Sequence, residues 1–408
     1  MPAKVPASKE RVRIRMYRVG FGDCFLVTFP GESREHHVLV DCGVHPRGNI
    51  KTLDAVVANI LDVTGKHLDI VIATHVHQDH VAGFGACAAQ FSTCRADEVW
   101  LPWTEDPSNA QALRLRGRQQ ALVGKLTAHF LALKSSKFDA VQAALLNLAS
   151  NQAALQTLRG GFRNSKVRYL KAGQDQRAPA GIEGLFVRVL GPSVDEGFLR
   201  QMDPPAKQRY LRMAGSETKD VDAVEPFEKR WKARKGEGPR LTKKVEKSLI
   251  EVATDPTAGL AFALDQAINN TSLATLFEYR GRSLFFPGDA QYGNWKAWID
   301  RPDAEAVLAH LDFYKVSHHG STNATPKSAL ERMSSPSLAA MVSTQSEPWE
   351  SIPERRLMDA LRRKAVRGIV RSDSLPVEKA PRGPPAGRLP KGFSRGDVWF
   401  DYTIPLES

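Results

Sequence analysis

The chain has 408 residues and a formal net charge of +12 at pH 7, from 57 Lys and Arg against 45 Asp and Glu. This length excludes a peptide hormone or a small zinc module, and a hydrophobic content of 42% is enough for a buried core rather than global disorder. The charge favours a polyanionic partner such as nucleic acid, with a generally basic enzyme as the alternative.

Four cysteines without a C-x-x-C pair are typical of reduced thiols in a cytosol. The N-terminal residues lack the apolar stretch of a signal peptide, and no run approaches the ~18 apolar residues of a membrane span. We therefore expect a cytoplasmic protein without membrane contact.

The first hundred residues read as short strands and one helix. Alternating or continuous apolar runs predict strands over 11–19, 24–29, 36–43 and 68–75, and helical spacing predicts a helix over 51–65. This order indicates a layered α/β core whose first half spans 1–104.

Long Ala- and Leu-rich segments then predict a helical insertion over 105–171. Between Gln111 and Lys171, eleven Lys or Arg stand against one acid, Asp139, a local charge of +10. Core strands are expected again over 172–192.

A polar stretch over 193–247 contains a basic run, 229–247, with nine Lys or Arg and two Glu. The basic run is consistent with two interpretations, a solvated surface loop or an arm that binds nucleic acid. If the loop is accessible, a trypsin-like protease is a possible regulatory partner. The second half of the core and a C-terminal tail occupy 248–408, with strands expected over 259–265, 272–281, 282–289 and 397–404.

The strongest chemical signal is ATHVHQDHVAGFGA, residues 73–86, in which three imidazoles and one carboxylate follow a buried strand within six positions. His75 and His77 alternate by two and can face one ion, while Asp79 and His80 can face a second. Asp289 in PGD also follows a strand, where a carboxylate can bridge two cations.

These motifs resemble the metallo-β-lactamase-fold hydrolase superfamily, whose H-x-H-x-D-H signature matches His75 to His80. An Asp-x-Gly turn (Asp41 to Gly43), the PGD carboxylate and a late histidine follow in the family's order. Within the superfamily, the motifs are most similar to those of the nuclease-like domain of the DNA-uptake protein ComEC. The shared motifs are V-G-x-G-D (Val19 to Asp23), N-x-x-S-L (Asn269 to Leu273) and K-V-x-H-H-G-S (Lys315 to Ser321).

The resemblance implies a four-layer αββα sandwich and two divalent metal ions, with Zn²⁺ as the first expectation and Mn²⁺ as the alternative. The expected metal ligands are His75, His77, Asp79, His80, Asp289 and His318, with His318 preferred to His319. Asp79, His80, Asp289 and His319 are the expected catalytic residues, and Asp41 is expected to support the histidine turn. The expected substrate contacts are Ser321, Thr322 and Asn270.

One departure concerns a further histidine that completes the first metal site in many superfamily members. The only histidine between Val81 and Asp289 is His129, which lies in the helical insertion and fits a helix surface better than a ligand position. Metal identity therefore stays open.

The resulting hypothesis is a metal-dependent phosphodiesterase or nuclease that attacks DNA or RNA through a metal-bridging hydroxide. A hydrolase of a small ester, lactone or cyclic nucleotide is one alternative, and a binding or regulatory module with a degenerate metal site is another. The oligomeric state is left open.

Overall fold

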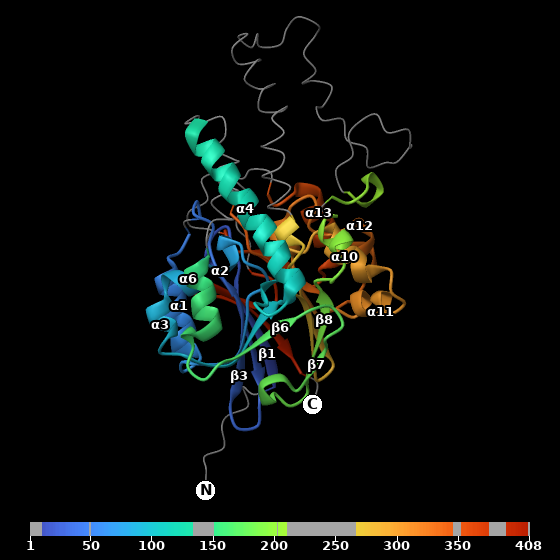
Figure 1. The fold of residues 1–408 in the computed structure, drawn as a ribbon. Coiled ribbons are helices and arrows are strands. Elements are labelled where there is room, and N and C mark those ends of the chain that lie inside the picture. Colours follow the sequence, from blue (N-terminus) through green and yellow to red (C-terminus); the bar gives the residue numbers. More distant parts are fainter. Residues whose placement is uncertain are drawn as a thin grey trace, which may run out of the picture.

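The computed structural model describes residues 10–48, 50–133, 151–201, 203–209, 267–345, 352–374 and 389–406 (Figure 1). Within these residues, the first sheet has the strand order β14 (Phe393–Arg395), β15 (Trp399–Pro405), β1 (Arg11–Tyr17), β2 (Cys24–Pro30), β3 (Glu35–Cys42), β4 (His67–Ile72), β5 (Arg95–Pro102) and β6 (Lys166–Leu170). The second has the order β13 (Gly368–Arg371), β12 (Ala339–Val342), β11 (Phe313–Lys315), β10 (Arg282–Phe286), β9 (Ala274–Tyr279), β8 (Leu185–Gly191) and β7 (Gln176–Arg177).

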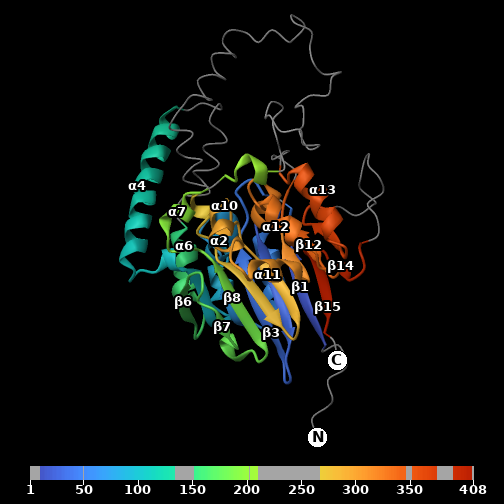
Figure 2. The same ribbon diagram turned by 90° about the vertical axis from the view of Figure 1, so that its right-hand side faces the viewer.

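Helices cover the outer face of each sheet, and Figure 2 shows the resulting layers from the side. The first sheet is covered by α1 (Leu53–Val63), α2 (Gln78–Ala86), α3 (Ala88–Phe91) and α6 (Gln152–Gln156). The second is covered by α10 (Tyr292–Ile299), α11 (Ala304–Ala309), α12 (Lys327–Arg332) and α13 (Arg355–Lys364). The four-layer α/β sandwich expected from the sequence is therefore confirmed.

Burial on both faces explains why the strands are apolar almost throughout. In β2, Phe25, Val27 and Phe29 belong to the core between the two sheets, whereas Cys24 and Leu26 pack toward the outer helices. A strand covered on both sides needs apolar side chains at odd and even positions alike. The predicted strands over 11–19, 24–29, 36–43 and 68–75 correspond to β1 to β4.

Two segments lie elsewhere than the sequence pattern suggested. β6 falls inside the segment expected to be a helical insertion, yet it pairs in parallel with β5 and so belongs to the first sheet. β15, near the C-terminus, pairs with β14 and with β1 in the first sheet, although strands β7 to β13 of the second sheet lie between β1 and β14 in the chain. The pairings of β6 with β5 and of β15 with β1 join residues far apart in sequence, which hydrophobic periodicity cannot detect.

The insertion contributes α4 (Ala110–Leu133), which leaves the first sheet after β5. The Arg116 guanidinium donates to the backbone carbonyls of Thr104 and Asp106 and fixes the base of this helix. His129 lies in α4, but its side chain is outside the described part of the chain. The basic run 229–247 and the strand expected over 259–265 are also outside it.

Strand direction brings the motif residues to one edge of the sandwich. β3, β4 and β5 are parallel in the first sheet, and β10, β11 and β12 are parallel in the second. The carboxyl ends of parallel strands share one edge, so the turns after β3, β4, β10 and β11 meet there. These turns carry Asp41, the His75–His80 motif, Asp289 and the His318–His319 pair.

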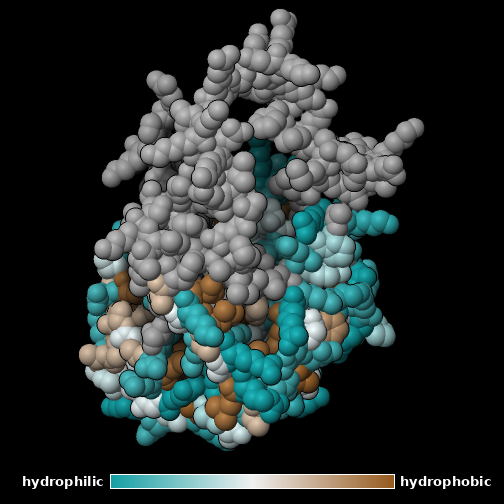
Figure 3. All heavy atoms as spheres, turned by 45° about the horizontal axis from the view of Figure 1, so that its top comes forward, coloured by the Kyte–Doolittle hydropathy of each residue, from teal (hydrophilic) through white to brown (hydrophobic). Residues whose placement is uncertain are grey.

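The described surface drawn in Figure 3 is mainly hydrophilic, with hydrophobic residues scattered among polar ones. No helix in the described part of the chain is both long enough and apolar enough to cross a membrane.

Candidate metal centre

The H-x-H-x-D-H motif forms the turn between β4 and α2. His77 is the extended residue that precedes α2, and the backbone N–H groups of His80 and Val81 both bond to its carbonyl at 3.0 Å. Asp79 and His80 therefore lie in the first helical turn. A Cβ on Gly43 would lie 2.4 Å from the backbone of Asp79 and His80, so the Asp-x-Gly turn allows α2 to approach β3 closely.

Asp79, His80, Asp289 and His319 form one buried cluster, with one potential ligand atom from each residue lying within 4.8 Å of the others. The Nε2 atoms of His80 and His319 lie 3.1 and 3.3 Å from Oδ2 of Asp289. His319 Nε2 is also 3.1 Å from Oδ2 of Asp79. Nε2 of His80 is buried without a hydrogen-bond partner, and this mixed set of imidazole nitrogens and carboxylate oxygens fits a divalent cation.

In both histidines of this cluster, the other ring nitrogen, Nδ1, forms a hydrogen bond within the protein. Nδ1 of His80 donates to Oδ2 of Asp41 at 2.8 Å, and Nδ1 of His319 donates to the Ser343 carbonyl at 2.8 Å. Asp41 also accepts from the backbone N–H and the hydroxyl of Thr74, at 2.7 and 2.8 Å. These bonds turn both Nε2 atoms toward the carboxylates, as carboxylate and carbonyl partners do behind metal-binding histidines.

Replacing Asp41 with asparagine is expected to lower metal affinity by about 10- to 100-fold, because the His80 ring would lose its charged partner. Asp41 has a φ of 58°, a conformation that asparagine adopts readily, so the turn should be retained. Competition against a chromogenic chelator measures the affinity, and circular dichroism checks the fold. Unchanged affinity in a folded variant would show that Asp41 does not orient His80 for binding.

His75 and His77 form a second pair beside this cluster. Nε2 of His75 lies 3.0 Å from Nδ1 of His77, and the rings of His75 and His80 have centroids 4.1 Å apart. Nδ1 of His75 lies 3.3 Å from the hydroxyl of Ser272, which accepts the backbone N–H of Asp289 at 3.1 Å. Ser272 thus connects the histidine turn of the first sheet to the carboxylate turn of the second.

Burial and the neighbouring carboxylates shift the pKa values of these histidines in opposite directions. Burial disfavours the charged ring, but the carboxylates, above all Asp289, outweigh it and raise the pKa of His80 well above its ordinary value and that of His319 to about 10. Burial lowers the pKa of His77 to about 4 and, with the neighbouring imidazoles, also lowers the pKa of His75. At pH 7 the two rings of the Asp289 cluster are therefore protonated, their charge is balanced by the Asp79 and Asp289 carboxylates, and cation binding at Nε2 would release protons.

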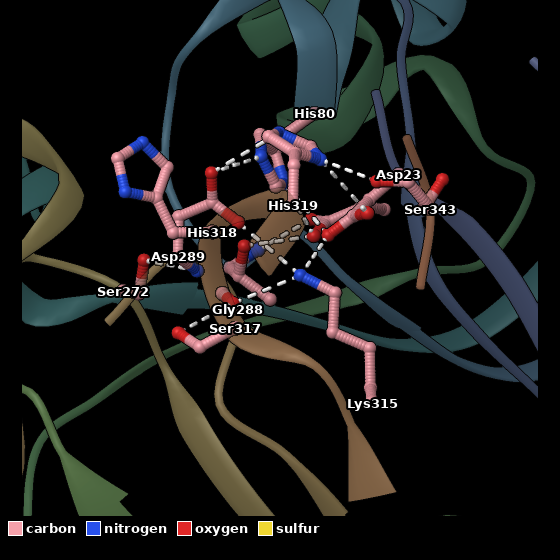
Figure 4. Close-up of polar contacts among 12 residues, drawn as sticks. Asp23, His80, Ser272, Gly288, Asp289, Lys315, Ser317, His318, His319 and Ser343 are labelled. Atoms are coloured by element: carbon pink, nitrogen blue, oxygen red, sulfur yellow. Dashed lines mark hydrogen bonds and ion pairs between the residues drawn. The ribbon is translucent and has the colours of Figure 1, made fainter. Parts of the chain in front are cut away.

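The adjacent histidines occupy different surroundings, and the structure brings His319 rather than His318 into the cluster (Figure 4). Nδ1 of His318 lies 2.7 Å from the Ser321 hydroxyl and 3.1 Å from Oδ1 of Asn323, and its Nε2 lies 3.3 Å from Nδ2 of Asn269. Both histidines have left-handed backbone, with φ of 43° and 52°. The alternation of an extended strand therefore does not apply, and spacing alone could not select the inward ring.

The three expected substrate contacts also differ in position. Ser321 belongs to the polar group around His318, and Thr322 is exposed beside it. Asn270 is buried and bonds to structural partners: its Nδ2 donates to the carbonyls of Leu199 and Gln201, and its Oδ1 accepts from two N–H groups at the start of α10. Asn270 therefore caps the start of α10 from a buried position, and its role as a substrate contact stays a prediction.

The sequence motifs predict no role for Asp23 or Lys315, but both side chains lie next to the cluster of Asp79, His80, Asp289 and His319. Asp23, between β1 and β2, groups with Asp41 and His80, and Lys315 ends β11 with its ammonium among carboxylates. The motifs V-G-x-G-D and K-V-x-H-H-G-S contain these two residues and could have indicated that they belong to the site. Hydrophobic periodicity alone predicts Lys315 to be an ordinary strand residue.

Comparison with known families supports this geometry. Residues 17–96 match the family model of the Metallo-beta-lactamase superfamily, a segment that contains Asp41 and the His75–His80 motif. A search of curated proteins finds no match. The two sheets with outer helices form a metallo-β-lactamase-like α/β sandwich, and its buried His and Asp cluster is suited to divalent metal binding.

Proposed function

We propose that this chain is a metal-dependent phosphodiesterase that acts on DNA or RNA. The observation that carries the proposal is the buried cluster of Asp79, His80, Asp289 and His319, with His75 and His77 beside it. Metallo-β-lactamase superfamily members are mostly hydrolases, and the ComEC-like order of the motifs is consistent with a nuclease.

Divalent ions held there, with Zn²⁺ and Mn²⁺ as candidates, would supply a nucleophilic water at neutral pH and stabilise charge on the scissile phosphate. His80 and His319 would bind through Nε2, with Asp41 and Ser343 holding the rings in place. His318 is half-buried and lies with Ser321 next to the exposed Thr322, where it would hydrogen-bond to the substrate. This assignment makes His319 the proposed ligand and His318 the proposed substrate contact.

Basic groups on two helices support a polyanionic substrate. The segment leading into α13 contacts the histidine turn directly, because the backbone N–H of Glu354 donates to the Gly320 carbonyl at 2.8 Å. α13 has five basic residues and one acid, and Arg355, Arg362 and Arg363 are exposed. Arg114 and Arg118 on α4 are also exposed. Figures 1 and 2 show α4 and α13 on opposite flanks of the same end of the molecule.

Replacing Arg355, Arg362 and Arg363 together with alanine is expected to weaken polynucleotide binding and to reduce the slope of log affinity against log salt by about 2 to 3, because fewer phosphates are neutralised. Fluorescence anisotropy with labelled single- and double-stranded DNA and RNA measures both quantities. The matched control replaces three basic residues, Arg11, Arg163 and Lys166, which are exposed at or just before the first residues of β1 and β6. Equal losses in both variants would contradict a binding surface at α13.

The deciding experiment is hydrolysis by metal-reconstituted protein. Single- and double-stranded DNA and RNA are compared with a cyclic nucleotide, a lactone and a thioester, each with Zn²⁺, Mn²⁺ and Mg²⁺. We expect metal-dependent cleavage of a polynucleotide that is lost in Asp79→Ala. Turnover of the lactone, thioester or cyclic nucleotide without polynucleotide cleavage would overturn the proposal.

A further inference from the structure

Lys315 places an ammonium group at the base of the metal centre. Its side chain is 2% exposed, and the Nζ atom contacts three acceptors: the Asp23 carboxylate, Oδ1 of Asp289 at 3.2 Å and the Gly288 carbonyl at 2.9 Å. An ammonium has three donors, so these contacts use all of them. Figure 4 shows the side chain reaching this point from β11.

This contact makes the two oxygens of Asp289 unequal. Oδ1 lies against Lys315, whereas Oδ2 lies between the Nε2 atoms of His80 and His319. Ser272 holds the backbone N–H of Asp289, and these side-chain contacts on both oxygens hold the carboxylate itself in one orientation. Only Oδ2 is turned toward the cluster where a cation fits.

Asp23 keeps Lys315 in this position. Asp23 is 1% exposed, and its backbone N–H donates to the Asp79 carbonyl at 2.8 Å while its carbonyl accepts from Gly43 at 2.9 Å. Its carboxylate is therefore fixed by the same turns that carry the histidines. A buried carboxylate is costly unless a cation or hydrogen bonds compensate it, and Lys315 is a cation that Asp23 and Asp289 share.

We propose that Lys315 is a positioning residue that withholds one oxygen of Asp289 from bound metal and thereby makes the two cation positions unequal. The position formed by Asp79, His80, Oδ2 of Asp289 and His319 binds tightly. The position at His75 and His77 lacks the second Asp289 oxygen and fills only at higher metal concentration. This inference rests on the proposed metal-dependent function, since it concerns the same centre.

The test is a calorimetric titration of metal-free protein with Zn²⁺ and, separately, with Mn²⁺, with bound metal counted by mass spectrometry. Wild type should bind one ion at least about tenfold more tightly than the second. Lys315→Met alone leaves Asp23 uncompensated and is at risk of not folding. The informative variant is therefore Lys315→Met with Asp23→Asn, which removes both charges of the pair.

The double variant should bring the two affinities together, within about threefold, because Oδ1 of Asp289 becomes available. Asp23→Asn alone keeps the ammonium on Asp289 and should retain the unequal pattern, as should Lys296→Met, a matched change at a more exposed lysine on α10. Thermal melting verifies that each variant folds.

The possible failures are distinguishable. Wild-type protein that binds neither metal would overturn the proposed metal-dependent function. Two equally tight ions in wild type, or an unchanged affinity ratio in the folded double variant, would overturn the role of Lys315 while leaving metal dependence intact.

Discussion

Substitution of Asp289 by asparagine is expected to lower hydrolysis on the order of 10³-fold or more and to remove bound metal from the cluster. Asp289 lies beside both imidazoles that we propose as ligands, with Oδ2 3.1 Å from Nε2 of His80 and 3.3 Å from Nε2 of His319. An amide of the same shape keeps the packing but removes the negative charge of the carboxylate, which would attract the cation. Metal content by mass spectrometry and single-turnover cleavage measure the two losses.

The control for this substitution is Asp300→Asn at the end of α10, where the carboxylate is paired with Lys296 near the surface. That variant should retain full metal content and turnover. An Asp289→Asn protein that melts like wild type and still binds metal and cleaves substrate at the normal rate would exclude Asp289 from the centre.

Alanine substitution of the adjacent histidines is expected to separate metal binding from substrate contact. His319→Ala should lower metal affinity by about 100-fold, because the ring that faces Asp79 and Asp289 is lost. His318→Ala should keep the metal content and lower kcat/KM by about 10- to 100-fold, because His318 lies with Ser321 and Asn323 outside the cluster.

Each histidine variant is the control for the other, since the two residues differ by one position and are both held in left-handed backbone. Equilibrium dialysis at several metal concentrations and steady-state kinetics at saturating metal distinguish the two effects. The reverse pattern, with metal lost in His318→Ala and kept in His319→Ala, would restore His318 as the ligand.

Local pattern was sufficient for much of the fold. The strands β1 to β4 follow from alternating or continuous apolar runs, and α1 follows from apolar residues at helical spacing. These elements are decided by neighbours in sequence, because one face or both faces of each must be buried. The placement of β6 and β15 in the first sheet was not predictable in the same way, since each pairs with a distant strand.

The sequence by itself determined which chemical groups the site contains: the H-x-H-x-D-H turn, the carboxylate of PGD and the paired histidines all follow strands, where side chains can converge. Tertiary structure alone decided which of these groups face one another. His319 rather than His318 turns inward because two consecutive left-handed residues reverse the chain, and Asn270 is used to cap α10. Lys315 reaches Asp23 only because β11 and the β1–β2 turn, nearly three hundred residues apart, meet at one edge of the sandwich. Such contacts depend on the packing of two sheets against each other, which no local spacing encodes.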